Sequence, residues 1–590
     1  SLLAQMVLGK TGRVCRRQFS APTFISWGFF FNFIAMCFRF VFLFFYCFSF
    51  AQDFIDLDSL HFKSLFYQSP NIKLNNIGDP IIFLVPIEDD DFYLDHYSSK
   101  VRNVDFFKQN YLHPHDSIYS FISYQKTYSE GGLVETFLSR PIGPNIKLNF
   151  SYNNLNSVGF YVNQENKYSV IDASVLYHSK NNPYSFNLSF FSNNGFYNQN
   201  GGLSNYNTDL SSDLQITYLN SAQTIIKKRI LQFDQHYLIN DKLKLKHHFL
   251  INNFERSYID LNPQSYHYSL TPFDFSLEGS YEHFTFFQRY ANSISINNIN
   301  FVLSVNHNYY NTNDIILNEL GDLDITISTT DSFDFKNNIY FKLGFFPAGY
   351  NKHNYFIDLK LKKKLNAFDN NLRFLFLSKK PDFFSKQYYT GGDFNWHNFL
   401  SSRVASFSFS STLIDRNFFF SATFNHYVNY LYFNTVASPL QSTDEILYYN
   451  FRINKKWVFN NLTFNSILYF QKSNNEVLSV PSLLFKQQLK YDCYVFKDIR
   501  LLSSYSFLIF SNYYINNYYP LTDVFYHNLN EKKGLIPLSS AEIHLYKENF
   551  SLGFIFDDLT NFFYEGNYLI KDYVLPQPSL RLAVRWSFID

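Results

Sequence analysis

The stretch that decides the fold lies at the end of the sequence and reads Leu580-Arg581-Leu582-Ala583-Val584-Arg585-Trp586-Ser587-Phe588. Its even-numbered positions are apolar, and its odd-numbered positions are Arg, Ala or Ser. Successive side chains of a β-strand point to opposite faces, so this alternation predicts a strand with one apolar and one polar face. In a soluble sandwich the apolar face would pack on a second sheet, whereas in a membrane barrel it contacts lipid and the arginines face a wet lumen.

The same alternation recurs along the rest of the chain. It is clearest over residues 146–153, 184–190, 243–249 and 355–362, which are separated by polar turn clusters such as residues 180–183, 240–241 and 369–371. After residue 52 there is no run of 18 apolar residues, so no helical membrane span is expected there. The pattern predicts consecutive antiparallel strands joined by turns.

These strands predict an all-β fold class, a single large antiparallel transmembrane β-barrel over residues 115–590. A spanning strand needs about 9–11 residues, so this length predicts an even number of about 16–24 strands. Closure into a barrel would leave no exposed sheet edge. Residues 52–114 lack the pattern and contain the acidic run Glu88–Asp91, and we assign them to a short N-terminal periplasmic extension.

The N-terminal region predicts export. From Met36 the chain has a basic residue, Arg39, an apolar run over residues 40–48, and small residues at Ser49 and Ala51, which is the pattern of a signal peptide over residues 36–51. The alternative is a membrane anchor over residues 24–50, but polar residues interrupt that stretch. Residues 1–35 are interpreted as an upstream or non-native leader.

Composition narrows the class of protein without deciding it. Lys and Arg total 50 and Asp and Glu total 49, a balance that argues against a nucleic-acid-binding surface. Aromatic residues make up 21%, which suits a barrel, although A/T-rich codons also raise Phe and Tyr. After removal of residues 1–51 only Cys493 remains, so neither an internal disulfide nor a cysteine zinc site is expected.

No motif in the sequence predicts catalysis. His113-Pro114-His115-Asp116 has metal-ligand residue types, but Pro114 and the neighbouring turn signals favour an ordinary barrel-entry segment. Asp89–Asp91 favours a solvated acidic turn, because consecutive acids lack the alternate spacing of a calcium loop. Gly131-Gly132 and Gly201-Gly202 lack the residues of a phosphate loop, and no nucleophile elbow is present. We therefore expect no enzyme, no cofactor and no metal; a hydrolase with a Ser-His-acid cluster is a remaining alternative.

Two groups of residues are the candidate functional residues. If the apolar positions face lipid, the charged positions between them line the lumen, and their mostly cationic character predicts a mild preference for anions. These residues are Lys147, Lys244, Lys246, Asp358, Lys360, Lys362, Arg581 and Arg585. Trp586 and Phe588, close to the chain end, are expected to be the signal that the outer-membrane insertion machinery reads.

Five segments resemble the "putative porin" family of Bacteroidota outer membranes. They are Asn149–Gln164 with its Gly-Phe-Tyr-Val-Asn-Gln turn, Tyr177–Tyr184, Asn198–Leu203, Tyr389–Asn398 and the ending Arg585–Asp590. The third departs from the family at Gln199, where an acidic residue is usual. The resemblance would cover most of the chain after about residue 110 and implies a porin-like barrel more strongly than it implies a substrate.

We therefore expect a channel in the outer membrane of a Gram-negative bacterium that passes small hydrophilic solutes by diffusion. The expected partners are outer-membrane lipid, the insertion machinery and the solutes, with a homo-oligomer possible and no nucleic acid. The alternative is a plugged barrel that serves a binding, adhesion, secretion or uptake complex. A lumen filled by loops or by residues 52–114 would favour that alternative. A soluble secreted β-protein would instead have a polar outward face.

Overall fold

The computed structural model describes residues 70–86, 118–178, 183–263, 280–298, 300–312, 320–329, 338–381 and 399–589. The leader, the signal peptide, His113–Asp116 and the acidic run Glu88–Asp91 lie outside these ranges. No helix within the described ranges is long and apolar enough to cross a membrane.

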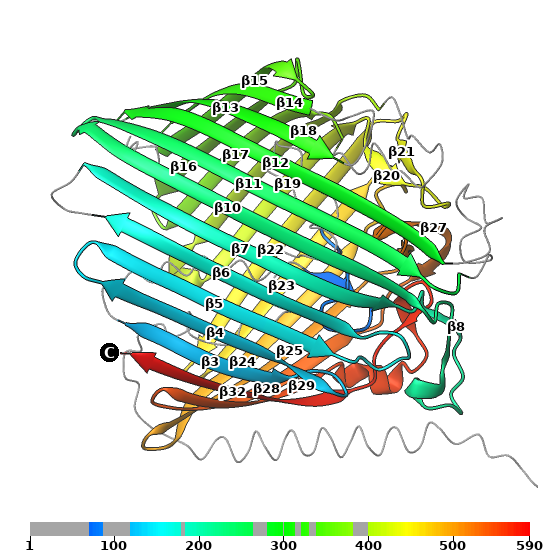
Figure 1. Cartoon of the computed structure of the whole chain (residues 1–590). Coiled ribbons are helices and arrows are strands. Elements are labelled where there is room, and N and C mark those ends of the chain that lie inside the picture. Colours follow the sequence, from blue (N-terminus) through cyan, green and yellow to red (C-terminus); the bar gives the residue numbers. More distant parts are fainter. Residues whose placement is uncertain are drawn as a thin grey trace, which may run out of the picture. The chain divides into compact units, whose positions relative to one another are not determined.

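Twenty-two antiparallel strands form one closed barrel, in which each strand pairs with the next along the chain (Figure 1). The first strand pairs with the last, with Ile122 opposite Trp586, and this pairing closes the ring. The predicted fold class is thus confirmed. The barrel strands are β3 (Tyr119–Lys126), β4 (Gly131–Ile142), β5 (Ile146–Ser157), β6 (Asn166–His178), β7 (Tyr184–Gln199), β10 (Ala222–Asn240), β11 (Leu243–Asp260), β12 (Tyr281–Asn298), β13 (Phe301–Thr312), β14 (Leu320–Thr329), β15 (Asn338–Gly349), β16 (Tyr355–Leu365), β17 (Phe368–Lys379), β18 (Ser402–Leu413), β19 (Phe418–Val428), β22 (Ile446–Phe459), β23 (Leu462–Ser473), β24 (Leu483–Phe496), β25 (Ile499–Phe510), β28 (Leu538–Lys547), β29 (Phe550–Asp557) and β32 (Ser579–Ile589).

Each strand has an apolar outward face and a more polar inward face, and β32 illustrates the division. Trp586 and Phe588 point outward and are 53% and 46% exposed, whereas Arg581 and Arg585 point inward and are 4% and 9% exposed. A closed ring offers no second sheet on which the outward face could pack. The alternation therefore has the form predicted for a membrane barrel.

The two ends of the barrel differ in the length of their connections. Turns of a few residues, such as 143–145, 241–242 and 366–367, join strands at the end that also carries the last described residues. We call this the short-turn end. The opposite long-loop end carries extended connections, among them residues 200–221, 511–537 and 558–578.

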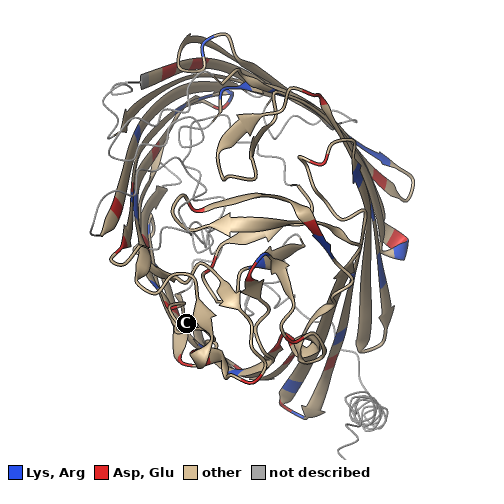
Figure 2. Ribbon diagram, turned by 90° about the vertical axis from the view of Figure 1, so that its right-hand side faces the viewer, with Lys and Arg blue, Asp and Glu red and all other residues tan. Residues whose placement is uncertain are grey.

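The long connections fold into small elements of their own, which Figure 2 shows across the ring when the barrel is seen from the long-loop end. The largest is a four-stranded sheet, which we call the lumen sheet, and the smaller pieces are two-stranded. The lumen sheet comprises β27 (Val524–Lys533), β26 (Tyr513–Tyr519), β30 (Tyr568–Ile570) and β31 (Tyr573–Val574). The smaller elements of the long connections are β8 (Leu203–Asn205), β9 (Ile216–Thr217), β20 (Leu431–Phe433), β21 (Pro439–Gln441) and the 3-10 turns η2 (Ser212–Leu214) and η4 (Leu559–Phe563). Two elements lie elsewhere: the hairpin of β1 (Asn71–Lys73) and β2 (Ile81–Phe83) precedes the first barrel strand, and the 3-10 turn η3 (Ile414–Arg416) lies in the short connection between β18 and β19.

Candidate functional site

Residues 70–86, which form the hairpin of β1 and β2 and which we call the lumen segment, lie against the inward face of the barrel. Ile72 and Leu84 of this segment share one buried apolar cluster with Tyr469, Leu484 and Phe510 of β23, β24 and β25. These inward positions are apolar and buried where the lumen segment packs on them. The hydrophobic effect therefore favours a docked segment.

This position differs from the one expected from the sequence. Residues 52–114 were assigned to a periplasmic extension, but residues 70–86, the described part of that range, lie inside the barrel near its long-loop end. The lumen segment ends at the same wall that its apolar residues contact, since the Leu84 carbonyl oxygen accepts a hydrogen bond of 2.8 Å from the Gln471 amide of β23.

A polar turn of the lumen segment is bonded to β5 and to the β5–β6 loop. The Asn76 amide donates to the carbonyl oxygens of Ser157 and Gln164 at 3.0 and 2.7 Å, and its side-chain oxygen accepts from the Ser157 hydroxyl at 2.5 Å. The carboxylate of Asp79 accepts from the backbone N–H of Asn76 at 2.7 Å and from the Asn166 amide at 2.6 Å. Because these groups are buried, each unmade bond would leave a desolvated polar atom.

A cluster of charged residues joins the lumen segment to the closing seam of the barrel. Lys73 donates to the hydroxyl of Tyr128, which itself lies 3.3 Å from Asp558. The guanidinium of Arg581 donates to the neighbouring Asp557 at 2.5 Å and lies over the Tyr128 ring at 5.5 Å. The lumen segment and β32 thus supply two cations, and the end of β29 with the residue after it supplies two carboxylates. Tyr128, from the β3–β4 turn, lies between them.

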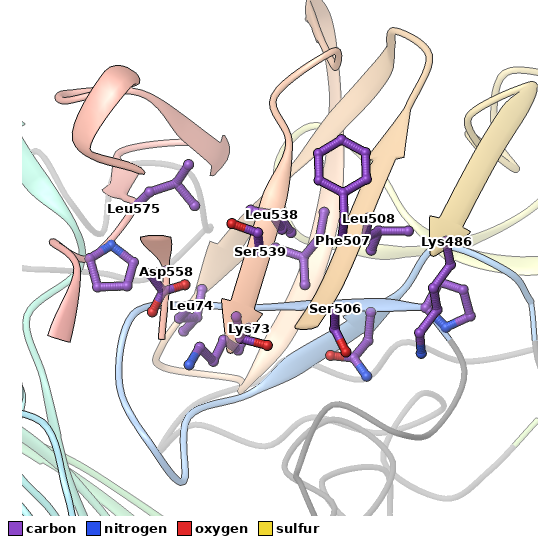
Figure 3. A pocket seen from close by; sticks show the side chains of 15 residues that line it. Lys73, Leu74, Lys486, Ser506, Phe507, Leu508, Leu538, Ser539, Asp558 and Leu575 are labelled. Atoms are coloured by element: carbon purple, nitrogen blue, oxygen red, sulfur yellow. The ribbon is translucent and has the colours of Figure 1, made fainter. Parts of the chain in front are cut away.

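Figure 3 shows a small cavity beside this cluster, where the lumen segment runs past β24, β25 and β28. Its volume is about 80 Å³, enough for a few water molecules, and its lining is mostly apolar. Lys73 and Asp558 lie toward one side of it and Lys486 of β24 toward the other. The lumen segment therefore docks without filling every space against the wall.

The lumen sheet occupies a second part of the long-loop end. The Arg256 guanidinium, on the inward face of β11, donates to the Pro520 carbonyl oxygen at 2.9 Å. Tyr258 of the same strand packs in a buried apolar cluster with Tyr519 and Val524 of the lumen sheet. The 511–537 connection is therefore folded onto the barrel wall and not outward from the rim.

The cationic residues singled out in the sequence lie on inward faces but are not gathered into one site. Lys244 and Lys246 share the face of β11 that continues through buried Arg256, and Lys147 lies on the inward face of β5. In β32, Arg581 is paired with Asp557, and Arg585 donates to the Tyr119 hydroxyl at 3.0 Å. These two arginines stabilise the wall and the closing seam.

A denser group lies on β15, β16 and β17. Asp358 is buried and accepts two hydrogen bonds from Arg373, at 2.8 and 3.1 Å, while the Lys360 ammonium lies 3.1 Å from the same carboxylate. Lys342 stands opposite Asp358 in register, and Lys362 follows Lys360 on the same face. Lys342 and Arg373 are not among the residues expected from the sequence to line the lumen. The alternation along β15 and β17 could have identified them, because each occupies an inward position.

The proposed insertion residues lie on the outer surface. The rings of Trp586 and Phe588 are stacked with centroids 5.4 Å apart, and the Phe550 ring of β29 meets Trp586 edge-on at 6.4 Å. Within the described ranges no group of three His, Cys, Asp or Glu side chains could hold a metal ion.

Comparison with known proteins identifies the family. A family model described as "putative porin" matches residues 67–590. A search of curated protein sequences finds no match. The fold is similar to that of a mutant ferric enterobactin receptor of Pseudomonas aeruginosa, with 9% identity, a TM-score of 0.57, and 80% of this chain and 81% of that chain covered.

Two further solved structures share the fold. A siderophore receptor of Acinetobacter baumannii has 10% identity and a TM-score of 0.55 over 80% of each chain. The FrpB iron transporter of Neisseria meningitidis has 9% identity and a TM-score of 0.57, with 80% of this chain and 82% of that chain covered. Such low identities show a shared barrel architecture alone, whereas the family match spans most of this sequence, and the chain therefore belongs to the family described as "putative porin".

Proposed function

We propose that the protein is a plugged transport barrel of a Gram-negative outer membrane, which admits small hydrophilic solutes when the lumen segment leaves its docking site. The observation that carries the proposal is the packing and hydrogen bonding of residues 70–86 against the inward face. The sequence alone favoured an open channel for diffusion. A filled lumen was the observation that would favour a plugged barrel, and residues 70–86 supply it.

Two general observations support this choice. Barrels of 22 strands are wide enough to need a plug if they are not to leak, and outer-membrane transporters of this size have plugged lumens. The solved structures of similar fold are two siderophore receptors and an iron transporter. These names support transport through a barrel of this fold, and their ligands are not assigned to this protein.

The same proposal places the protein in its membrane. The outward apolar face would contact outer-membrane lipid, the short-turn end would face the periplasm, and Trp586 and Phe588 would be read by the insertion machinery. Export would use the signal peptide at residues 36–51. No catalytic step is proposed, because solutes would move down their gradients once the path is open.

The test is conductance of residues 52–590 in planar lipid bilayers. In a Cys493→Ser background, Asn76→Cys with Ser157→Cys would lock the lumen segment to β5, since these two side chains are in contact. A release variant, Asn76→Ala with Asp79→Ala, removes the bonds of the polar turn. We expect rare openings in the unmodified chain, frequent openings in the release variant, and no openings in the oxidised lock until it is reduced.

The matched control is Asn240→Ala with Asp241→Ala, the same two residue types at the end of β10 and in the short turn that follows it. Its conductance should equal that of the unmodified chain. Steady conductance of the unmodified chain that the oxidised lock does not reduce would contradict a plug and favour an open channel for diffusion.

A further inference from the structure

The inward face near the short-turn end carries a concentration of cationic side chains. On β16, Lys360, Lys362 and Lys364 occupy alternate positions of one face, the face that also carries buried Asp358. Neighbouring strands add Arg373 opposite Lys360 and Lys342 opposite Asp358. Residues opposite each other in register point to the same side of a sheet, so all of these side chains face the lumen.

The acidic residues of this group do not balance its cations. Asp358 is shared between Arg373 and Lys360 and is almost completely buried. Beyond it, Lys362 stands opposite Asn371, and Lys364 stands opposite Asp369. Lys362 and Lys364 are exposed, so their charges act directly on a solute that passes this part of the wall.

A second cationic group lies on β10 and β11. Lys244 and Lys246 follow one another on the inward face, and His236 stands opposite Lys246. The nearby carboxylate of Asp234 is held by the His248 ring at 2.6 Å and by the Gln232 amide at 2.6 Å. The Asp234 carboxylate therefore has one partner on its own strand, β10, and one on the paired strand, β11.

Four inward-facing carboxylates of the long-loop half are, in contrast, hidden from a passing solute. Asp260, Asp322, Asp324 and Asp557 are each at most 1% exposed. They accept hydrogen bonds from Ser221, Asn351, Asn306 and Arg581, respectively. Their charges are therefore stabilised by donors within the protein. Among the described residues of these groups, Lys362 and Lys364 therefore supply exposed positive charge near the short turns.

We call the two cationic groups, on β15–β17 and on β10–β11, the cationic wall. We propose that the cationic wall makes the open barrel selective for small anionic solutes, such as those that carry a carboxylate or phosphate group. The inference rests on the proposed transport function and names its substrate class. Anions are drawn to the wall by Coulomb attraction in a confined, partly desolvated path, where charge acts more strongly than in bulk water.

The experiment measures the reversal potential of the release variant under a KCl gradient. We expect chloride to be several-fold more permeant than potassium. Lys362→Glu with Lys364→Glu should reduce or reverse this preference. Lys363→Glu is the matched control, because Lys363 lies between them on β16 but on the outward face.

Ionic strength supplies a second readout. Raising the salt from about 0.1 M to 1 M shortens the screening length from about 10 Å to 3 Å, so the anion preference should fall. Replacing chloride with phosphate and then with acetate in the same gradient shows which anion chemistry is favoured.

Different results would contradict the transport function and the anion selectivity. A release variant that does not conduct contradicts the transport function. A conducting variant that prefers potassium, shows no preference, or changes equally with Lys363→Glu and the inward pair contradicts anion selectivity alone.

Discussion

At the residue scale, Asp79 both shapes the polar turn of the lumen segment and binds that turn to the barrel wall. Its carboxylate accepts from two backbone N–H groups of its own turn and from the Asn166 amide of β6. Asp79→Ala would leave the two buried backbone N–H groups without an acceptor, although the Asn166 amide would keep its bond to the Ile77 carbonyl oxygen. The loss would cost about 1–3 kcal/mol of docking free energy. We expect faster proteolysis within residues 70–86, with the far-ultraviolet circular dichroism of the barrel unchanged.

Asp241→Ala, in an exposed short turn, is the control for this experiment and should leave proteolysis as it is. Equal protease resistance of the Asp79 variant and the unmodified chain would show that the turn does not hold the segment.

Asp558, in the loop after β29, predicts a pH dependence of docking. Burial raises its pKa from 3.8 to about 6; Lys73 opposes this shift and the charge of Asp557 adds to it, while Tyr128 and Arg581 also oppose it. A raised pKa means that the docked state favours the protonated carboxyl group. Its contribution to docking is full below about pH 3.8 and is lost as the pH rises through about 6.

Hydrogen exchange of residues 70–86, corrected for the intrinsic effect of pH, measures this dependence. Protection should be higher at pH 4.5 than at pH 7.5 in the unmodified chain, and it should be nearly independent of pH in Asp558→Asn. Protection that increases with pH would show that the Coulomb attraction of Lys73 outweighs the burial of the carboxyl group.

At the scale of elements, the pairing of β29 with β32 depends on a buried ion pair near the end of both strands. Arg581 and Asp557 are nearly inaccessible to solvent, so Arg581→Met alone would leave a buried unpaired carboxylate. Such a change costs about 3–5 kcal/mol, whereas replacing both partners by apolar residues is often close to neutral. We expect a low yield of barrel folded into vesicles for Arg581→Met.

The double variant Arg581→Met with Asp557→Leu should recover most of the folding yield, as measured by heat-modifiable gel mobility. A double variant that folds no better than the single one would show that the strand pairing needs the guanidinium itself, for example over the Tyr128 ring.

At the scale of the whole molecule, the outward face has to match lipid over its full circumference. An outward row of rings crosses neighbouring strands, with centroids of Phe374 and Phe407 4.9 Å apart and those of Phe407 and Phe424 6.1 Å apart. Phe407→Arg would place a charge in this row and cost about 2–4 kcal/mol if the position lies near the bilayer midplane. The free energy of unfolding from lipid vesicles measures the loss.

Ser408→Arg, one position along β18 and on the inward face, is the matched control and should cost much less, because that face is polar. Similar losses for the two variants would mean that the outward face is not in lipid.

Much of the barrel could be predicted because its signal is local. The alternation in β5, β16 and β32 assigned each side chain to a face, and the even strand number followed from closure. The alternation of apolar and polar residues, with its period of two, was sufficient to predict that Lys360 and Arg585 face inward. What could not be predicted was the partner of each inward residue, because a partner depends on the register and on what fills the lumen.

The sequence by itself determined the class of structure, the two faces of its strands and the family resemblance, because each depends on neighbouring residues. Only the tertiary structure decided that residues 70–86 dock inside the barrel, that the Tyr128 hydroxyl links Lys73 to Asp558, and that the 511–537 connection folds onto β11. These contacts join residues hundreds of positions apart. Their stability comes from burial and hydrogen bonding that exist only once the ring has closed around them.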